Sequence, residues 1–123
     1  MHSADHSAAA RTNPYDVVYA ILRLVGDHGG RFGRTRAACA IGGLPAPALD
    51  PQDVIDVTGY DVVRGWSREE LVDSIDRLIA SGWIERSDAT EPKIELSKSG
   101  FEFRVMIERE LRERAQEDPQ LTL

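Results

Sequence analysis

The stretch from Ser67 to Trp83 constrains the fold most, because it carries the signals of a complete helix with both ends marked. Ser67 and Glu70 have the spacing of a capping box, in which each side chain binds the backbone N–H of the other residue. Gly82 can take the left-handed conformation that ends a helix without steric cost. The apolar residues in between recur on one face: Leu71, Val72, Ile75, Leu78 and Ile79. A strand-like run follows at once, which is typical of the second helix of a helix-turn-helix that leads into a β-wing.

Three further helices are predicted from caps and breakers. Asn13 is a good N-cap and is followed by Pro14, so a helix is predicted from there to Gly26. A short helix is predicted over 35–41, ended by a pair of glycines, and another over 51–57. The last helix begins at Ser97 or Ser99 and runs to Pro119. Ser99 and Glu102 have the spacing of a second capping box.

The segment between the central and last helices alternates apolar and polar residues in two short runs, 83–87 and 93–97, separated by the turn 88–92. This pattern predicts a β-hairpin. The order helix, short helix, helix, hairpin, long helix then indicates an α+β, mostly α, winged-helix fold. We expect a leader or linker at 1–12, one domain at 13–116 and a tail at 117–123.

Composition excludes several classes of protein. The 123 residues contain one cysteine, Cys39, so neither an intramolecular disulfide nor a multi-cysteine zinc site is available. No apolar run approaches the ~20 residues that span a bilayer, and the N-terminus lacks the apolar core of a secretory signal. We therefore expect a cytoplasmic protein without a membrane partner. No catalytic triad or metal-ligand spacing is present, so we expect a non-enzyme with no metal and no cofactor.

Charge is distributed unevenly around a glycine-rich loop. The whole chain has a net charge of −6, but residues 11–40 carry five arginines and two aspartates. Arg31, Arg34 and Arg36 flank Phe32, the single large apolar residue of the stretch 27–36. One interpretation is a basic loop and helix N-terminus that bind phosphates. The other is a turn anchored by Phe32, with arginines that only face solvent.

Three motifs make residues 15–107 similar to the RQC domain, the winged-helix module of RecQ-type DNA helicases. They are Gly30-Arg31-Phe32-Gly33, Leu78-Ile79-x-x-Gly82-Trp83-Ile84 and Ile94-x-Leu96-Ser97-x-x-Gly100. The resemblance implies duplex DNA binding at forks and junctions, in DNA repair or replication, with a helicase motor as partner. It also implies that the wing, residues 84–96, helps to part base pairs.

The predicted DNA-binding set combines this resemblance with the placement of the arginines. Its members are Arg31, Phe32, Gly33, Arg34, Thr35, Arg36, Arg64, Ser67 and Arg68, with Arg86 and Lys93 on the wing. The sequence departs from the family in the acidic Asp56 and Asp61 before the central helix, and in a wing tip without an aromatic residue. Two alternatives therefore stay open. One is a protein-interaction winged helix that uses its acidic face or forms a homodimer through the last helix, and the other is a winged-helix transcription regulator.

Overall fold

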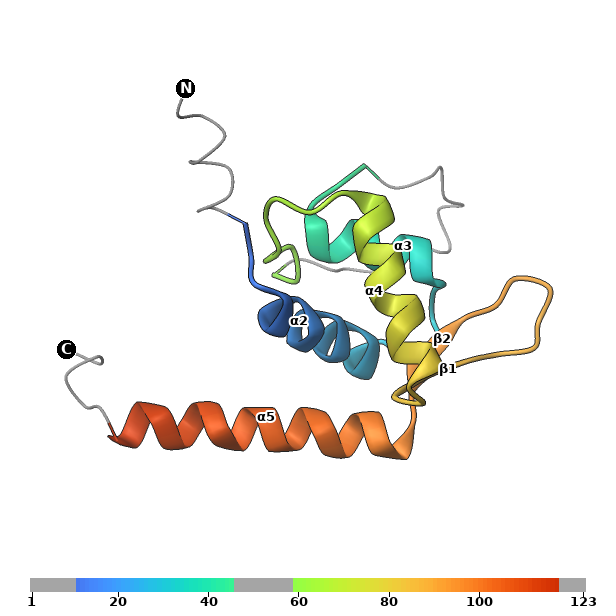
Figure 1. Cartoon of the computed structure of the whole chain (residues 1–123). Helices are drawn as coiled ribbons and strands as arrows, with labels where there is room; N and C mark the ends of the chain where they lie inside the picture. Colours follow the sequence, from blue (N-terminus) through green and yellow to red (C-terminus); the bar gives the residue numbers. More distant parts are fainter. Residues whose placement is uncertain (1–10, 46–58, 118–123) are drawn as a thin grey trace, which may run out of the picture.

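The computed structural model describes residues 11–45 and 59–117, and within them the chain is mostly helical with one small sheet (Figure 1). The described elements are α2 (Pro14–Asp27), α3 (Arg34–Gly42), α4 (Arg68–Ala80), β1 (Ile84–Arg86), β2 (Ile94–Leu96) and α5 (Lys98–Glu117). The predicted α+β class with mainly helical content is confirmed. No helix in these ranges is both long and apolar enough to cross a bilayer. The helix predicted over 51–57 lies outside the described residues.

Helix α4 has both of the ends that its sequence predicts. The backbone N–H of Glu70 donates to Ser67 Oγ at 3.1 Å, and the backbone N–H of Ser67 donates to Glu70 Oε1 at 2.9 Å. After the helix, Gly82 has a φ of +83°, a conformation that a residue with a side chain rarely adopts. The capping box therefore sets where α4 begins, and Gly82 turns the chain toward β1.

Helix α5 begins differently from one of our predictions. Its cap is Ser97, whose Oγ accepts a hydrogen bond from the backbone N–H of Gly100 at 3.1 Å and donates one to the carbonyl of Gly82 at 2.6 Å. The capping box predicted for Ser99 and Glu102 is wrong, because Ser99 already lies inside the helix. The first turn of α5 also lies close to the end of α4 because Gly100 has no side chain. A Cβ added to Gly100 would lie 2.0 Å from the carbonyl oxygen of Trp83.

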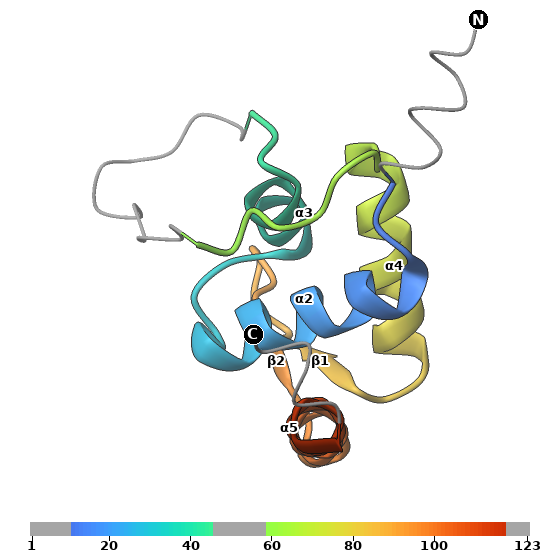
Figure 2. The ribbon, with the colours of Figure 1, turned by 90° about the vertical axis from the view of Figure 1, so that its left-hand side faces the viewer.

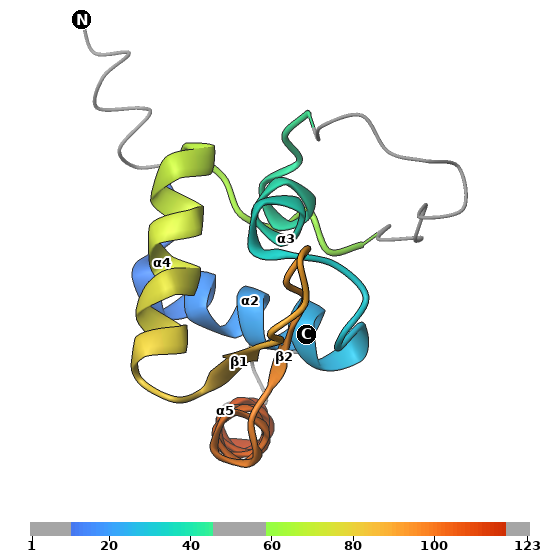
Figure 3. The same cartoon turned by 90° about the vertical axis from the view of Figure 1, so that its right-hand side faces the viewer.

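The core lies where α2, α3 and α4 meet, with the hairpin and α5 closing it on one side (Figures 2 and 3). Each of these elements contributes side chains that are almost fully buried. The largest of them are Ile21, Leu22, Leu24, Phe32, Ile41, Leu71, Ile75, Ile84, Ile94 and Ile107. Burial of this apolar surface is the main source of stability for such a fold.

The hairpin is antiparallel, with Ile84 opposite Leu96 and Arg86 opposite Ile94. The glycine-rich loop before α3 is tied to it by two backbone hydrogen bonds. Gly30 N–H donates to the carbonyl of Ile94 at 2.9 Å, and Ile94 N–H donates to the carbonyl of Phe32 at 3.0 Å. These bonds bring the beginning of α3 next to the hairpin, two regions about sixty residues apart in the chain.

Two residues that we assigned to the leader contact the folded domain. Arg11 makes an ion pair with Glu70 at 2.8 Å, and its guanidinium lies 4.2 Å from the ring centre of Trp66. The carbonyl of Thr12 accepts a hydrogen bond from Trp66 Nε1 at 2.7 Å. The backbone N–H of Ser67, and after it Arg11, hold the pKa of Glu70 below its ordinary value.

Helix α5 is attached to the domain along one edge. Arg104 makes ion pairs with Asp27 of α2 at 2.9 Å and with Glu108 at 3.3 Å. Burial acts to raise the pKa of Asp27, but hydrogen bonds from Tyr60 and Arg104 outweigh it, so the pKa lies below its ordinary value. Farther toward the hairpin, Phe103 stacks on Trp83 with ring centres 4.2 Å apart. The opposite edge of α5 faces away from α2 (Figure 1).

Candidate nucleic-acid interface

The loop before α3 is anchored by Phe32, as one interpretation of the sequence predicted. Its side chain is only 1% exposed and lies in the core. Phe32 was also in the predicted DNA-binding set, but a ring at this depth cannot stack on a base. Its contribution is to hold the backbone that leads into α3.

Gly33 is the N-cap of α3 and brings this helix close to the hairpin loop. A Cβ at Gly33 would lie 3.0 Å from the carbonyl oxygen of Pro92, which is tighter than most contacts of real side chains. Gly33 also has no side-chain oxygen, so the first turn of α3 lacks the capping bond that Ser67 supplies to α4. The N–H groups of this turn point toward the helix N-terminus, where a helix carries partial positive charge.

A groove runs between the first turn of α3 and the hairpin loop, and we call it the basic groove. Its lining is Gly33, Arg34, Thr35, Arg36, Arg86, Thr90, Glu91, Pro92 and Lys93. Four of these side chains are cationic and only one is a carboxylate, so the lining has a net charge of +3. On a chain whose total charge is −6, this is a local reversal of sign.

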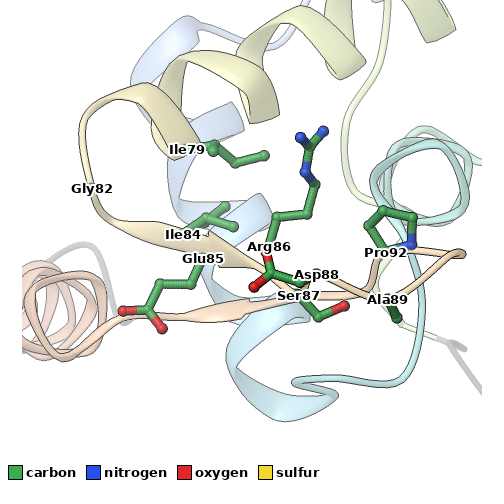
Figure 4. A pocket seen from close by; sticks show the side chains of 9 residues that line it. All are labelled: Ile79, Gly82, Ile84, Glu85, Arg86, Ser87, Asp88, Ala89 and Pro92. Atoms are coloured by element: carbon green, nitrogen blue, oxygen red, sulfur yellow. The ribbon is translucent and has the colours of Figure 1, made fainter.

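Arg86 is the cation that the basic groove shares with a second hollow, on the α4 side of the hairpin (Figure 4). Its guanidinium rises from β1 toward α4, whereas Glu85 points to the opposite side of the strand. This alternation is the normal pattern of a β-strand. The second hollow mixes Ile79 and Ile84 with Arg86 and Asp88, so it has no concentration of one charge.

A third hollow lies on the other side of Thr35, between α3 and the first turns of α4, and we call it the acidic hollow. It is lined by Thr35, Arg68, Glu69, Val72, Asp73 and Asp76. The lining holds three carboxylates and one arginine, and Arg68 lies 3.5 Å from Glu69 Oε2. The other two carboxylates pair with arginines outside the lining, Asp73 with Arg77 and Asp76 with Arg34. The predicted residue Arg68 is therefore close to the basic groove but sits among acids.

Arg34 connects the basic groove to the acidic hollow. Its guanidinium makes an ion pair with Asp76 of α4, and both side chains remain about 41% exposed. Ion pairs with this much exposure stabilise a fold by at most about 1 kcal/mol. Exchanging Asp76 for another anion as the partner of Arg34 therefore costs little free energy.

The remaining predicted residues lie apart from the basic groove. Arg64 donates to the backbone carbonyls of Asp61 and Val63. The hydroxyl of Ser67 is used in the cap of α4. Arg31 is exposed but lines neither the basic groove nor the acidic hollow. The structure thus joins Gly33–Arg36 with Arg86 and Lys93 of the hairpin and separates them from Arg64 and Ser67.

Sequence reasoning missed Thr90 and Pro92, which line the groove from the hairpin loop. The sequence gives little indication of their role, because the neighbours of a turn residue are known only once the hairpin is placed against α3. Within the described residues, no group of three or more His, Cys, Asp or Glu side chains could hold a metal ion. No family model, no curated protein and no solved structure matches the chain at a significant level.

Proposed function

We propose that this chain is a non-catalytic winged-helix module that resembles the RQC domain and binds the phosphate backbone of duplex or forked DNA. Four observations on the backbone support the winged-helix assignment: the order of the helices, the hairpin after α4, the long final helix, and the loop before α3 that is bonded to β2. In this assignment the hairpin is the wing and α4 is the helix that precedes it.

The observation that carries the proposal is the basic groove. Arg34, Arg36, Arg86 and Lys93 come from two separate elements and line one surface with a single carboxylate, Glu91. Guanidinium and ammonium groups are the usual ligands of phosphate oxygens, and contacts to phosphates carry affinity without sequence information. We therefore expect binding that is independent of base sequence.

The acidic hollow argues against the transcription-regulator alternative. A regulator of this fold places the helix before its wing in the major groove of an operator. Here the three carboxylates on that helix, Glu69, Asp73 and Asp76, each pair with one arginine. The helix face therefore has no surplus of cations to offset the phosphates that line the groove. A DNA molecule therefore meets this domain from the hairpin side. The helicase motor that the RQC resemblance implies is the partner we propose, in DNA repair or replication.

The test is a titration of the full chain into labelled forked, blunt and single-stranded DNA, followed by fluorescence anisotropy at several salt concentrations. Four phosphate contacts predict that log K falls against log salt with a slope of about −3 to −4. The double variant Arg36→Glu, Lys93→Glu reverses two groove charges, and we expect it to lower affinity by about 100-fold and to flatten the slope.

The matched control is the double variant Arg112→Glu, Arg114→Glu, which changes net charge equally at exposed positions of α5, away from both the basic groove and the acidic hollow. We expect it to lower affinity by less than about fivefold, through long-range repulsion alone. Equal losses in the two double variants would contradict a local site. Undetectable binding at low salt would contradict DNA binding altogether.

A further inference from the structure

Helix α5 has one edge that no described element covers. Its inner edge is occupied by Ile107 in the core and by Arg104 against Asp27. On the outer edge, Phe101 is 58% exposed and Met106 is 46% exposed. All three ribbon views show α5 at the boundary of the described domain, with α2 and the hairpin on one side of it (Figures 1 to 3).

The same outer edge carries two opposite charges without an ion-pair partner among the described residues. Glu102 and Arg109 are both exposed, and neither takes part in any of the ion pairs of the described chain. They are seven residues apart, so they lie on nearly the same line along the helix, about 10.5 Å from each other. Val105 lies between them and is partly exposed.

This arrangement is self-complementary in only one orientation. When two copies of α5 lie antiparallel about a two-fold axis near Val105, Glu102 of each copy faces Arg109 of the other. At 100° per residue the line through Glu102 and Arg109 runs between Val105 and Met106, so the two opposite-charge pairs lie between apolar side chains of both copies. In a parallel pair each charge faces its own copy, which is repulsive.

We infer that the outer edge of α5 binds a second copy of this chain, antiparallel, and makes the protein a homodimer. This inference is independent of the basic groove, whose residues lie on α3 and the hairpin. A single helix pair is at the lower end of the size range of specific interfaces. We therefore expect dissociation in the micromolar range, with weaker association at high salt.

The test is sedimentation velocity of the full chain between about 5 and 200 μM. The mass is expected to rise with concentration from 13.6 kDa toward twice that value. Glu102→Arg and Arg109→Glu, each alone, place like charges in both pairs and are expected to raise the dissociation constant at least tenfold. An equimolar mixture of these two variants restores opposite charges in both pairs, so we expect it to associate about as well as the unaltered chain.

The control is Arg114→Glu, which makes the same charge change about 140° around the helix from Arg109 and is expected to leave association unchanged. Circular dichroism melts check that every variant is folded. The inference is overturned if the unaltered chain stays monomeric at 200 μM, as it would if another segment or a different protein covered α5. It is also overturned if the two single variants dimerise normally, or if their mixture fails to associate.

Discussion

The basic groove and the acidic hollow meet at Thr35 and have opposite charge. On the hairpin side, four cations and one carboxylate line the surface, and on the α4 side one arginine stands among three carboxylates. Both surfaces depend on the first turn of α3, so they cannot be separated by moving one element. The acidic hollow has the sign of the whole chain, whose net charge is −6, whereas the basic groove has the opposite sign because the hairpin adds Arg86 and Lys93 to the arginines of α3.

This asymmetry limits how a polyanion approaches. A phosphate backbone laid across the first turn of α3 gains cations on the hairpin side and meets Glu69 and Asp73 on the other. The two carboxylates are largely exposed, with side chains 76% and 59% accessible, so water and salt screen them in part. We therefore expect the acidic hollow to weaken and orient binding without preventing it.

The largest expected effect comes from the anchor that both surfaces share. Phe32→Ala removes a ring that is 1% exposed and leaves a cavity, so we expect the free energy of unfolding to fall by about 3–5 kcal/mol. Phe32→Leu keeps most of the volume and is expected to cost less than about 1.5 kcal/mol. Urea unfolding measures both, and DNA affinity should track the folded fraction.

The opposite pattern would break this account of Phe32. If Phe32→Ala left stability unchanged but abolished DNA binding, the ring would act at the DNA interface. Phe32 would then not be the residue that holds the first turn of α3 in place for both surfaces. The Leu variant is the control for folding, because it fills the same pocket without an aromatic face.

Local signals were enough to predict most of the fold. The cap of α4 needs only Ser67 and Glu70, three residues apart, and the hairpin needs only alternation and a turn. The same kind of reasoning failed at Ser99, where two overlapping cap signals competed. Packing decided between them, because Gly100 must lie directly against the carbonyl of Trp83.

The candidate site was only half predictable, because its charges come together through distant contacts. Arg36 and Lys93 are far apart in sequence but line the same groove, because the backbone of Ile94 is bonded to the loop before α3. Asp76, which pairs with Arg34, lies 42 residues away. Arg64, which donates to the carbonyls of Asp61 and Val63, lies apart from the groove, and nothing in the local sequence indicates this.

A moderate effect is expected from neutralising the acidic hollow. Glu69→Gln with Asp73→Asn removes two negative charges beside the first turn of α3, so we expect DNA affinity to rise by about three- to tenfold. Glu110→Gln with Glu113→Gln removes the same charge from α5 and should change affinity by less than about twofold. Anisotropy titrations at one fixed salt concentration compare them, and equal gains would mean that net charge, and not the hollow, governs binding.

The smallest effect is expected at the ion pair that joins the two surfaces. Asp76→Asn releases Arg34 toward the basic groove, and because the pair is about 41% exposed on both sides we expect little change in stability. DNA affinity should rise by about two- to threefold, and in an Arg34→Ala background the same substitution should have a smaller effect, since the released cation is gone. A loss of affinity on Asp76→Asn would instead show that the carboxylate orients the guanidinium for phosphate. The acidic hollow would then be part of the binding surface, because it would supply the support that holds one of the four cations in place.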